Sequence, residues 1–243
     1  MKNLGEKIYI LDTCTSTNDI AKIMAEKGER EGTVVWALEQ IRGRGREGRK
    51  WISSKNKGLY FSIILRPQIA NPNLLTLFGA LSVLEIIEEN FKLEVKLKWP
   101  NDLIYKGKKL GGILGEGTYK GSKLSHIILG IGVNTNYEIE DFPEGLKEKT
   151  TSLRIILNKE IENQKLLITI LEKIKALYNM DFIQNELISH VNRYSFLKKG
   201  EKIKLKTTQS LVEGEYEGMD KDGSLLLNTK KGKIKIYSGH FIE

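Results

Sequence analysis

The segment Gly43–Trp51 combines side chains that could bind a polyanionic ligand. Its chemically informative residues are Gly43, Arg44, Gly45, Arg46, Gly48, Arg49, Lys50 and Trp51. Glycine tolerates positive φ and close approach to the backbone, so consecutive N–H groups can form an anion-binding concavity. Arginine adds a planar charged fork for phosphate or carboxylate oxygens, and tryptophan offers a face on which a flat base can stack. The segment therefore predicts a loop that closes over a small, adenine-bearing anion.

A solvated basic turn is the alternative interpretation of this loop, and its neighbours argue against it. Gln40 directly precedes the loop and could offer a donor and an acceptor to a ligand, or fix the loop backbone. The polar run Ser16–Asn18 stands where apolar residues at helical spacing begin. One of these side chains could cap that helix, which would leave the others free to bind a small polar ligand.

The elements that must position these residues alternate between strands and helices. Apolar, β-rich runs predict strands over 8–11, 33–38, 59–65, 95–99, 103–105, 109–114 and 124–133. Apolar residues at helical spacing predict long helices over 73–91 and from 163 onward, and a mixture of loop and short helix over 142–158. We expect an α+β fold in which helices flank a mixed sheet and the loop joins two of its strands.

Glycine pairs interrupt two of the predicted strands. Gly111 and Gly112 lie in one, and Gly130 and Gly132 in the other. Glycine weakens a strand interior, so these positions suggest the close approach of a ligand or of a neighbouring backbone. A bulge or a tight strand crossing would explain either pair alone.

The pattern changes near residue 198. Short strand-like runs follow, separated by turns at Asp222-Gly223 and Lys231-Gly232. We expect two domains, a larger one over residues 1–197 and a small β-barrel over residues 198–243.

Composition limits the partners and the compartment. The chain has 243 residues, with 39 Lys and Arg against 31 Asp and Glu, and its net charge of +8 favours anionic partners. Cys14 is the only cysteine, which excludes an intrachain disulfide and favours a reducing compartment. The three histidines are widely separated and predict no zinc site, and no apolar run is long enough to span a membrane. We expect a cytoplasmic protein.

Several motifs, taken together and in order, resemble the biotin–protein ligase family. They are Ser16–Asn18, Gln40 with Gly43–Trp51, Lys98–Asp102, Lys109–Leu114 and Gly130–Asn134. The resemblance covers the whole chain. It implies a class II synthetase-like catalytic domain followed by a small SH3-like β-barrel.

The resemblance also implies a reaction in two steps. Biotin and MgATP give biotinyl-5′-AMP, and a lysine of a biotin carboxyl carrier protein then takes the biotin. The cofactors would be ATP, biotin and Mg²⁺, and a homodimer is common in the family. Family members that repress transcription carry an N-terminal winged helix-turn-helix, whereas the catalytic pattern here begins near Ile8. We therefore expect no sequence-specific DNA binding.

Site residues carry over from the family by motif. Lys109 and Arg46 would be catalytic, and Asp102 would position Mg²⁺. The biotin-binding set would be Ser16, Thr17, Asn18, Gln40, Gly43, Arg44, Gly45, Arg46, Lys109, Gly112, Leu114, Gly130 and Gly132. The ATP- and adenylate-binding set would be Arg44, Arg46, Arg49, Trp51, Lys109 and Asn134. Ser16, Thr17 and Gln40 would bind the ureido head of biotin, and Trp51 would pack on adenine.

Two other functions remain open at this point. A lipoate–protein ligase would share the fold and the adenylate chemistry, but lipoate has no ureido head for Ser16, Thr17 and Gln40. A basic nucleic-acid-binding protein would fit the charge of +8, yet few aromatic residues interleave with the arginine-rich loop as stacking platforms would.

Overall fold

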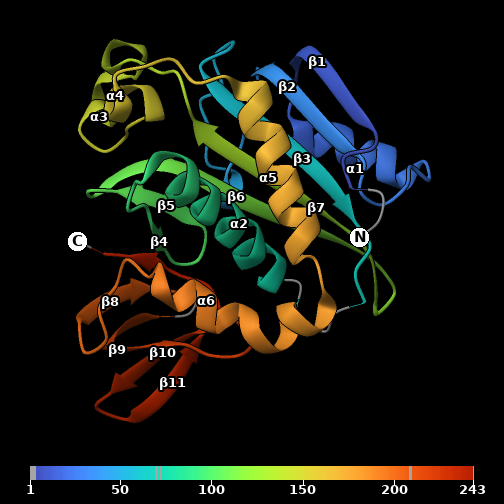
Figure 1. Cartoon of the computed structure of the whole chain (residues 1–243). Helices are drawn as coiled ribbons and strands as arrows, with labels where there is room; N and C mark the ends of the chain where they lie inside the picture. Colours follow the sequence, from blue (N-terminus) through green and yellow to red (C-terminus); the bar gives the residue numbers. More distant parts are fainter. Residues whose placement is uncertain (1–3, 69–70, 72, 208–209, 243) are drawn as a thin grey trace.

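A seven-stranded mixed sheet forms the centre of the computed structural model, which describes residues 4–68, 71, 73–207 and 210–242 (Figure 1). Its spatial order is β1-β2-β3-β7-β6-β5-β4. Among its described strands β1 and β2 pair in parallel, and every other neighbouring pair is antiparallel. The strands are β1 (Ile8–Cys14), β2 (Val34–Gln40), β3 (Gly58–Leu65), β4 (Lys96–Lys98), β5 (Asp102–Tyr105), β6 (Lys108–Lys120) and β7 (Lys123–Asn134). The predicted α+β class is confirmed.

Helices cover both faces of this sheet. On one face α1 (Thr17–Glu26) packs against β2, β3 and β7. On the other face α2 (Asn73–Phe91) packs against β6 and β7, α5 (Asn163–Leu177) lies beside it and reaches β3, and α6 (Leu187–Arg193) also contacts α2. Because α2 is enclosed on several sides, apolar residues occur around most of its circumference and are not confined to one face. Shorter helices α3 (Glu144–Lys147) and α4 (Leu153–Leu157) follow β7.

Alternation along β7 decides which residues face the functional side of the sheet. Ile127, Leu129 and Ile131 belong to the large core beneath α2 and α5. Ile128 packs instead with α1 on the opposite face. Since side chains alternate along a strand, Gly130 and Gly132 share the face of Ile128. They lie where the start of α1 and the glycine-arginine loop cross the sheet.

The last part of the chain forms a second, five-stranded antiparallel sheet in the order β11-β10-β9-β8-β12. Its strands are β8 (Lys202–Lys206), β9 (Leu211–Met219), β10 (Leu225–Thr229), β11 (Gly232–Ile236) and β12 (His240–Phe241). The expected closed barrel needs a correction. Within the part of the chain that the structure describes, β12 pairs with β8 alone, so β11 and β12 are both edges and the sheet stays open. This arrangement is consistent with an SH3-like domain.

The small sheet docks directly on the larger one. Leu205, Leu225 and Leu227 are buried in the same core as α2. The indole Nε1 of Trp99, which follows β4, donates to the Gly223 carbonyl at 3.0 Å. This bond holds the turn between β9 and β10 against Trp99, while Ser238, after β11, accepts from Arg46 of the glycine-arginine loop at 2.8 Å. Among the described residues no helix is both long and apolar enough to cross a membrane.

Candidate functional site

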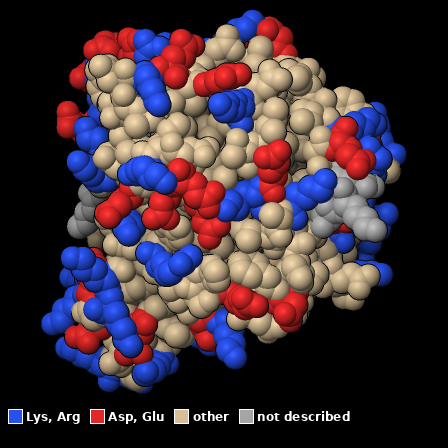
Figure 2. Space-filling model, viewed as in Figure 1, with Lys and Arg blue, Asp and Glu red and all other residues tan. Residues whose placement is uncertain are grey.

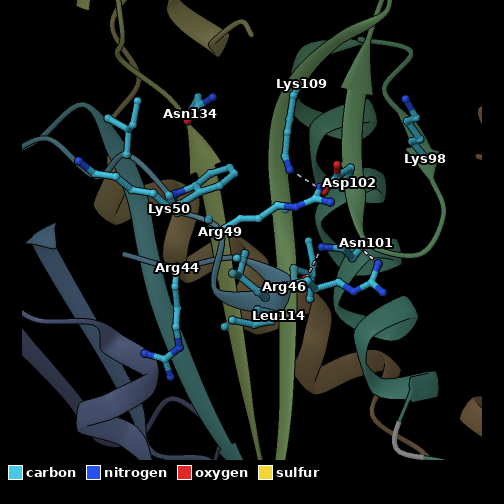
Figure 3. Close-up of a pocket in the computed structure, with 18 of the residues that line it drawn as sticks. Arg44, Arg46, Arg49, Lys50, Lys98, Asn101, Asp102, Lys109, Leu114 and Asn134 are labelled. Atoms are coloured by element: carbon cyan, nitrogen blue, oxygen red, sulfur yellow. Dashed lines mark hydrogen bonds and ion pairs between the residues drawn. The ribbon is translucent and has the colours of Figure 1, made fainter. Parts of the chain in front are cut away.

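A cavity of about 350 Å³ lies where the start of α1, the glycine-arginine loop, β6, β7 and the segment 239–241 meet (Figure 3). The sequence-predicted residues that line it are Ser16, Thr17, Asn18, Gln40, Arg44, Gly45, Arg46, Arg49, Trp51, Asp102, Lys109, Gly112, Leu114, Gly130, Gly132 and Asn134. Gly43 is not among the lining residues. It is buried beneath the loop, where a Cβ atom would lie 2.6 Å from the Trp51 carbonyl oxygen.

One end of the cavity carries a chain of partly buried hydrogen bonds. The backbone N–H and the hydroxyl of Thr17 both donate to Gln40 Oε1, at 2.8 and 3.1 Å. Gln40 Nε2 donates in turn to Ser53 Oγ at 2.8 Å. The Gln40 side chain therefore joins the start of α1 to Ser53, and Nε2 keeps one further hydrogen for a ligand.

The polar residues at the start of α1 do not cap the helix. Ser16 occupies the N-cap position in an extended conformation, and its side chain makes no capping hydrogen bond. Asn18 Oδ1 lies 2.6 Å from the hydroxyl of Ser62, a fully buried residue of β3. The side chains of Thr17 and Asn18 are thus engaged by other residues of the cavity wall, whereas Ser16 makes no capping hydrogen bond. Gly130 makes room for them, because a Cβ there would lie 2.2 Å from Asn18 Oδ1.

Glu116 of β6 connects this polar end to the loop. Its carboxylate accepts from Asn18 Nδ2 at 2.6 Å and from the Arg44 guanidinium at 3.0 Å. Arg44 also donates to Asp19 at 2.5 Å. Burial opposes the charge of Arg44, but the carboxylates of Glu116 and Asp19 raise its pKa above the ordinary value. Arg44 is therefore held as a fixed part of the wall.

Three further cations line the cavity; in Figure 3 Lys109 and Arg49 point toward Asp102, whereas Arg46 points toward Asn101. Lys109 of β6 pairs with Asp102 of β5 at 2.7 Å, and its Nζ lies 5.3 Å from the centre of the Trp51 ring. Arg46 and Arg49 enter from the loop. Arg46 donates to Ser238 Oγ at 2.8 Å, and burial lowers the pKa of its guanidinium. It stays charged because the ordinary pKa of arginine is far above neutrality.

The opposite end of the cavity is aromatic. The Trp51 indole lies against β7, where a Cβ on Gly132 would be 3.0 Å from it. Phe142 stacks on Tyr137 with ring centres 4.8 Å apart. Asn134 Nδ2 donates to the Thr151 carbonyl at 3.0 Å, so its amide is partly engaged by the protein. This end has the flat apolar surfaces that suit a nucleobase.

The cavity could hold a metal ion only together with a ligand that carries oxygen donors. Nowhere in the described ranges do three or more His, Cys, Asp or Glu side chains gather closely enough to bind a metal. Asp102 offers one carboxylate on the cavity wall, beside Lys109. Mg²⁺ that keeps its contacts to phosphates and water needs only one or two carboxylates, so Asp102 fits that use.

Several residues of the site carried no signal in the sequence. Ser62 and Glu116 lie in predicted strands, and the sequence does not distinguish them from polar residues on a solvent-facing side of a strand. Phe142 and the segment 239–241 come from regions far along the chain and reach the cavity only through the fold. Because side chains alternate along a strand, the spacing from Gly112 and Leu114 could have placed Glu116 on the same face of β6.

Comparison with known proteins agrees with this site. Residues 11–134 match the model of the biotin/lipoate A/B protein ligase family, and residues 200–242 match that of the biotin protein ligase C-terminal domain. The chain is 34% identical to the bifunctional ligase/repressor BirA of Bacillus subtilis, over 97% of this chain and 73% of that protein. Its structure resembles that of the biotin protein ligase from Aquifex aeolicus in complex with biotin and ATP. The TM-score is 0.83 at 32% identity, with 98% of each chain covered.

Proposed function

Because this chain belongs to the biotin/lipoate A/B protein ligase family, we propose that it activates biotin with ATP and transfers it to a lysine of a biotin carboxyl carrier protein. The observation that carries the proposal is one cavity with a polar end, a cationic middle and an aromatic end. These three parts match the ureido head, the carboxylate with its phosphate, and the adenine of biotinyl-5′-AMP. Lipoate would leave the polar end without a partner.

The first step brings together two anions, the biotin carboxylate and the α-phosphate of ATP. Their repulsion must be offset before the carboxylate oxygen can attack phosphorus and release pyrophosphate. Lys109, Arg46 and Arg49 all line the cavity and would supply that positive charge. Fixed charges in a partly desolvated site stabilise a transition state more than the same charges in water. These residues act by positioning and charge, and no side chain becomes covalently modified.

Lys109 must change partners for this step. In the structure its ammonium group is neutralised by Asp102. When the biotin carboxylate arrives, Lys109 can turn to it, and later to the phosphate of the adenylate. Mg²⁺ bound to ATP would then neutralise the carboxylate of Asp102 in place of Lys109. The ion supplies further neutralisation of the phosphates.

The polar end selects the acid. Ser16 and the remaining amide hydrogen of Gln40 face the cavity and would bind the ureido oxygen and nitrogens. Thr17 would complete this set. Gly112, Leu114 and Gly130 would leave room for the fused rings and the aliphatic chain. A site built to hydrogen-bond a polar head discriminates strongly against an analogue that lacks it.

Isotope exchange between pyrophosphate and ATP tests the first step. We expect exchange with biotin and Mg²⁺, and none with lipoate or without an acid. Label transfer to a biotin carboxyl carrier protein tests the second step, with a carrier whose acceptor lysine is replaced by arginine as the control. Exchange that lipoate supports as well as biotin would contradict the assignment.

The remaining partners are also proposals. At one edge of the large sheet, β4 is covered by residues 194–196, whereas Ile10 of edge strand β1 is 58% exposed. We propose a homodimer through the β1 edge, which light scattering at several concentrations would test. We propose no sequence-specific DNA binding, so any duplex binding should fall steeply as salt rises.

A further inference from the structure

A second cavity, of about 320 Å³, lies next to the first and opens toward α2 and the small sheet. The two cavities share six lining residues, which are Arg46, Trp99, Pro100, Asn101, Ile113 and Leu114. Arg46 stands between them, since its guanidinium contacts Ser238 at 2.8 Å and Asn101 at 3.5 Å. The second cavity therefore leads to the place where the phosphate of the adenylate would be held.

The lining of the second cavity is unlike that of the first. Its lining includes the apolar side chains of Leu77, Trp99 and Ile113, and hydroxyl and amide groups such as those of Thr76 and Tyr237. Of the described residues that line it, Arg46 alone carries a charge. A polyphosphate would find too little positive charge here. A protonated amine would find no carboxylate.

We propose that this second cavity admits the acceptor lysine of the carrier protein, an inference that rests on the proposed function. The apolar walls can cover the four methylene groups of a lysine side chain. Burial in such surroundings, close to Arg46, lowers the pKa of the incoming ammonium group and favours the free amine. The amine is the form that can attack.

The chemistry of transfer fits this path. The lysine nitrogen forms a bond to the carbonyl carbon of the mixed anhydride, and the bond from that carbon to the phosphate oxygen breaks. AMP leaves with the electron pair of the broken bond. The proton that the nitrogen loses passes to the departing phosphate or to water. Arg46 separates the two cavities, so its movement onto the phosphate during the first step would leave the path open for the second.

A reversible chemical block tests the path. Thr76 of α2 lines the second cavity and not the first. In Thr76→Cys, benzyl methanethiosulfonate would attach a benzylthio group that fills the cavity. The native Cys14 is buried, and burial raises the pKa of its thiol to about 11, so it should react little. Thr169→Cys on α5, outside both cavities, is the matched control.

Each labelled enzyme is compared with the same variant after reduction by dithiothreitol. At Thr76→Cys we expect labelling to slow biotin transfer to the carrier protein at least tenfold, while the burst of adenylate stays within twofold, and reduction to restore transfer. At Thr169→Cys labelling should change neither step. Transfer that persists in the labelled Thr76→Cys enzyme would overturn the inference. Loss of both steps would also overturn it, because ATP would then use this cavity. A reduced enzyme without biotin-dependent exchange would overturn the proposed function itself.

Discussion

Lys109 Nζ lies 2.7 Å from Asp102 Oδ1, across neighbouring strands β6 and β5. Both side chains are about one-third exposed, so the pair is accessible from the cavity. A lysine on a strand is more rigidly placed than the loop arginines around it. Asp102 thus neutralises the ammonium group of Lys109 until an anionic substrate takes the place of the Asp102 carboxylate.

Lys109→Ala should therefore depress adenylate formation. Loss of one contact that stabilises developing charge costs ~10²–10³ in rate. Pre-steady-state measurement of biotinyl-AMP would give the rate directly. Lys108→Ala, one residue earlier on β6, is the control, because alternation sends its side chain to the other face. A rate for Lys109→Ala within threefold of the parent would remove Lys109 from the mechanism.

Ser62 should act as a positioning residue for biotin. Its hydroxyl lies 2.7 Å from Thr17 Oγ1 and 2.6 Å from Asn18 Oδ1, and it is fully buried. Ser62→Ala leaves polar atoms without a partner, at a cost of about 1–3 kcal/mol. We expect the KM for biotin to rise about tenfold, while the KM for ATP stays within twofold.

Ser82→Ala provides a matched control for that change. Ser82 is also fully buried, but its hydroxyl donates to the Phe78 carbonyl within α2. It should lower stability without changing the KM for biotin. If both variants changed only stability, Ser62 would have no role in placing the ligand.

Local patterns in the sequence predicted the elements, whereas the family resemblance supplied most of the residues that line the cavity. Apolar runs placed β3 and β7, and the glycine-arginine loop stood out by composition. The contacts of Glu116 and Ser62 could not be predicted, because their partners lie on other elements far along the chain. The small sheet was expected to close, yet closure depends on strand length and pairing at β12, which local patterns do not encode.

The pH dependence of stability should reflect Glu29. Its carboxylate accepts from Lys7 Nζ at 2.7 Å and from the Tyr9 hydroxyl at 2.9 Å, which ties β1 to the segment after α1. The hydrogen bond from Lys7, with those of Arg30 and Tyr9, lowers the pKa of Glu29 from 4.5 to about 2. A lowered pKa stabilises the fold above the unfolded value, and this contribution is lost as pH falls from 4.5 toward 2.

Urea unfolding at several pH values would measure this effect. In Glu29→Gln the free energy of unfolding should fall less between pH 4.5 and 2 than it does in the parent. Glu26→Gln, at the exposed end of α1, should leave the slope unchanged. Equal slopes for all three proteins would contradict the role of Glu29.

The loop is also tied to the small sheet. Glu47, at φ 57°, lies 2.6 Å from His240 Nε2, and this hydrogen bond lowers the pKa of the Glu47 carboxyl. Exposed pairs of this kind contribute little each. Glu47→Gln and His240→Gln should each speed dissociation of biotinyl-AMP by roughly two- to fivefold, and the double variant should be no faster than the more affected single one. Multiplying effects in the double variant would mean that the two residues act independently.

Arg46 should decide whether the adenylate stays bound. Its guanidinium holds the loop against Ser238 and borders the phosphate region of the cavity. Arg46→Gly removes that fork and loosens a loop that already contains several glycines, so biotinyl-AMP should escape into solution before transfer. Free biotinyl-AMP would then modify exposed lysines of unrelated proteins. The dissociation rate of the adenylate and biotin incorporation into a bystander protein without the acceptor motif would measure this.

Arg46→Ala separates loss of the guanidinium from added flexibility, because alanine keeps the backbone restricted. If Arg46→Gly held the adenylate as tightly as the parent and left the bystander unlabelled, retention would have to depend on other residues of the loop.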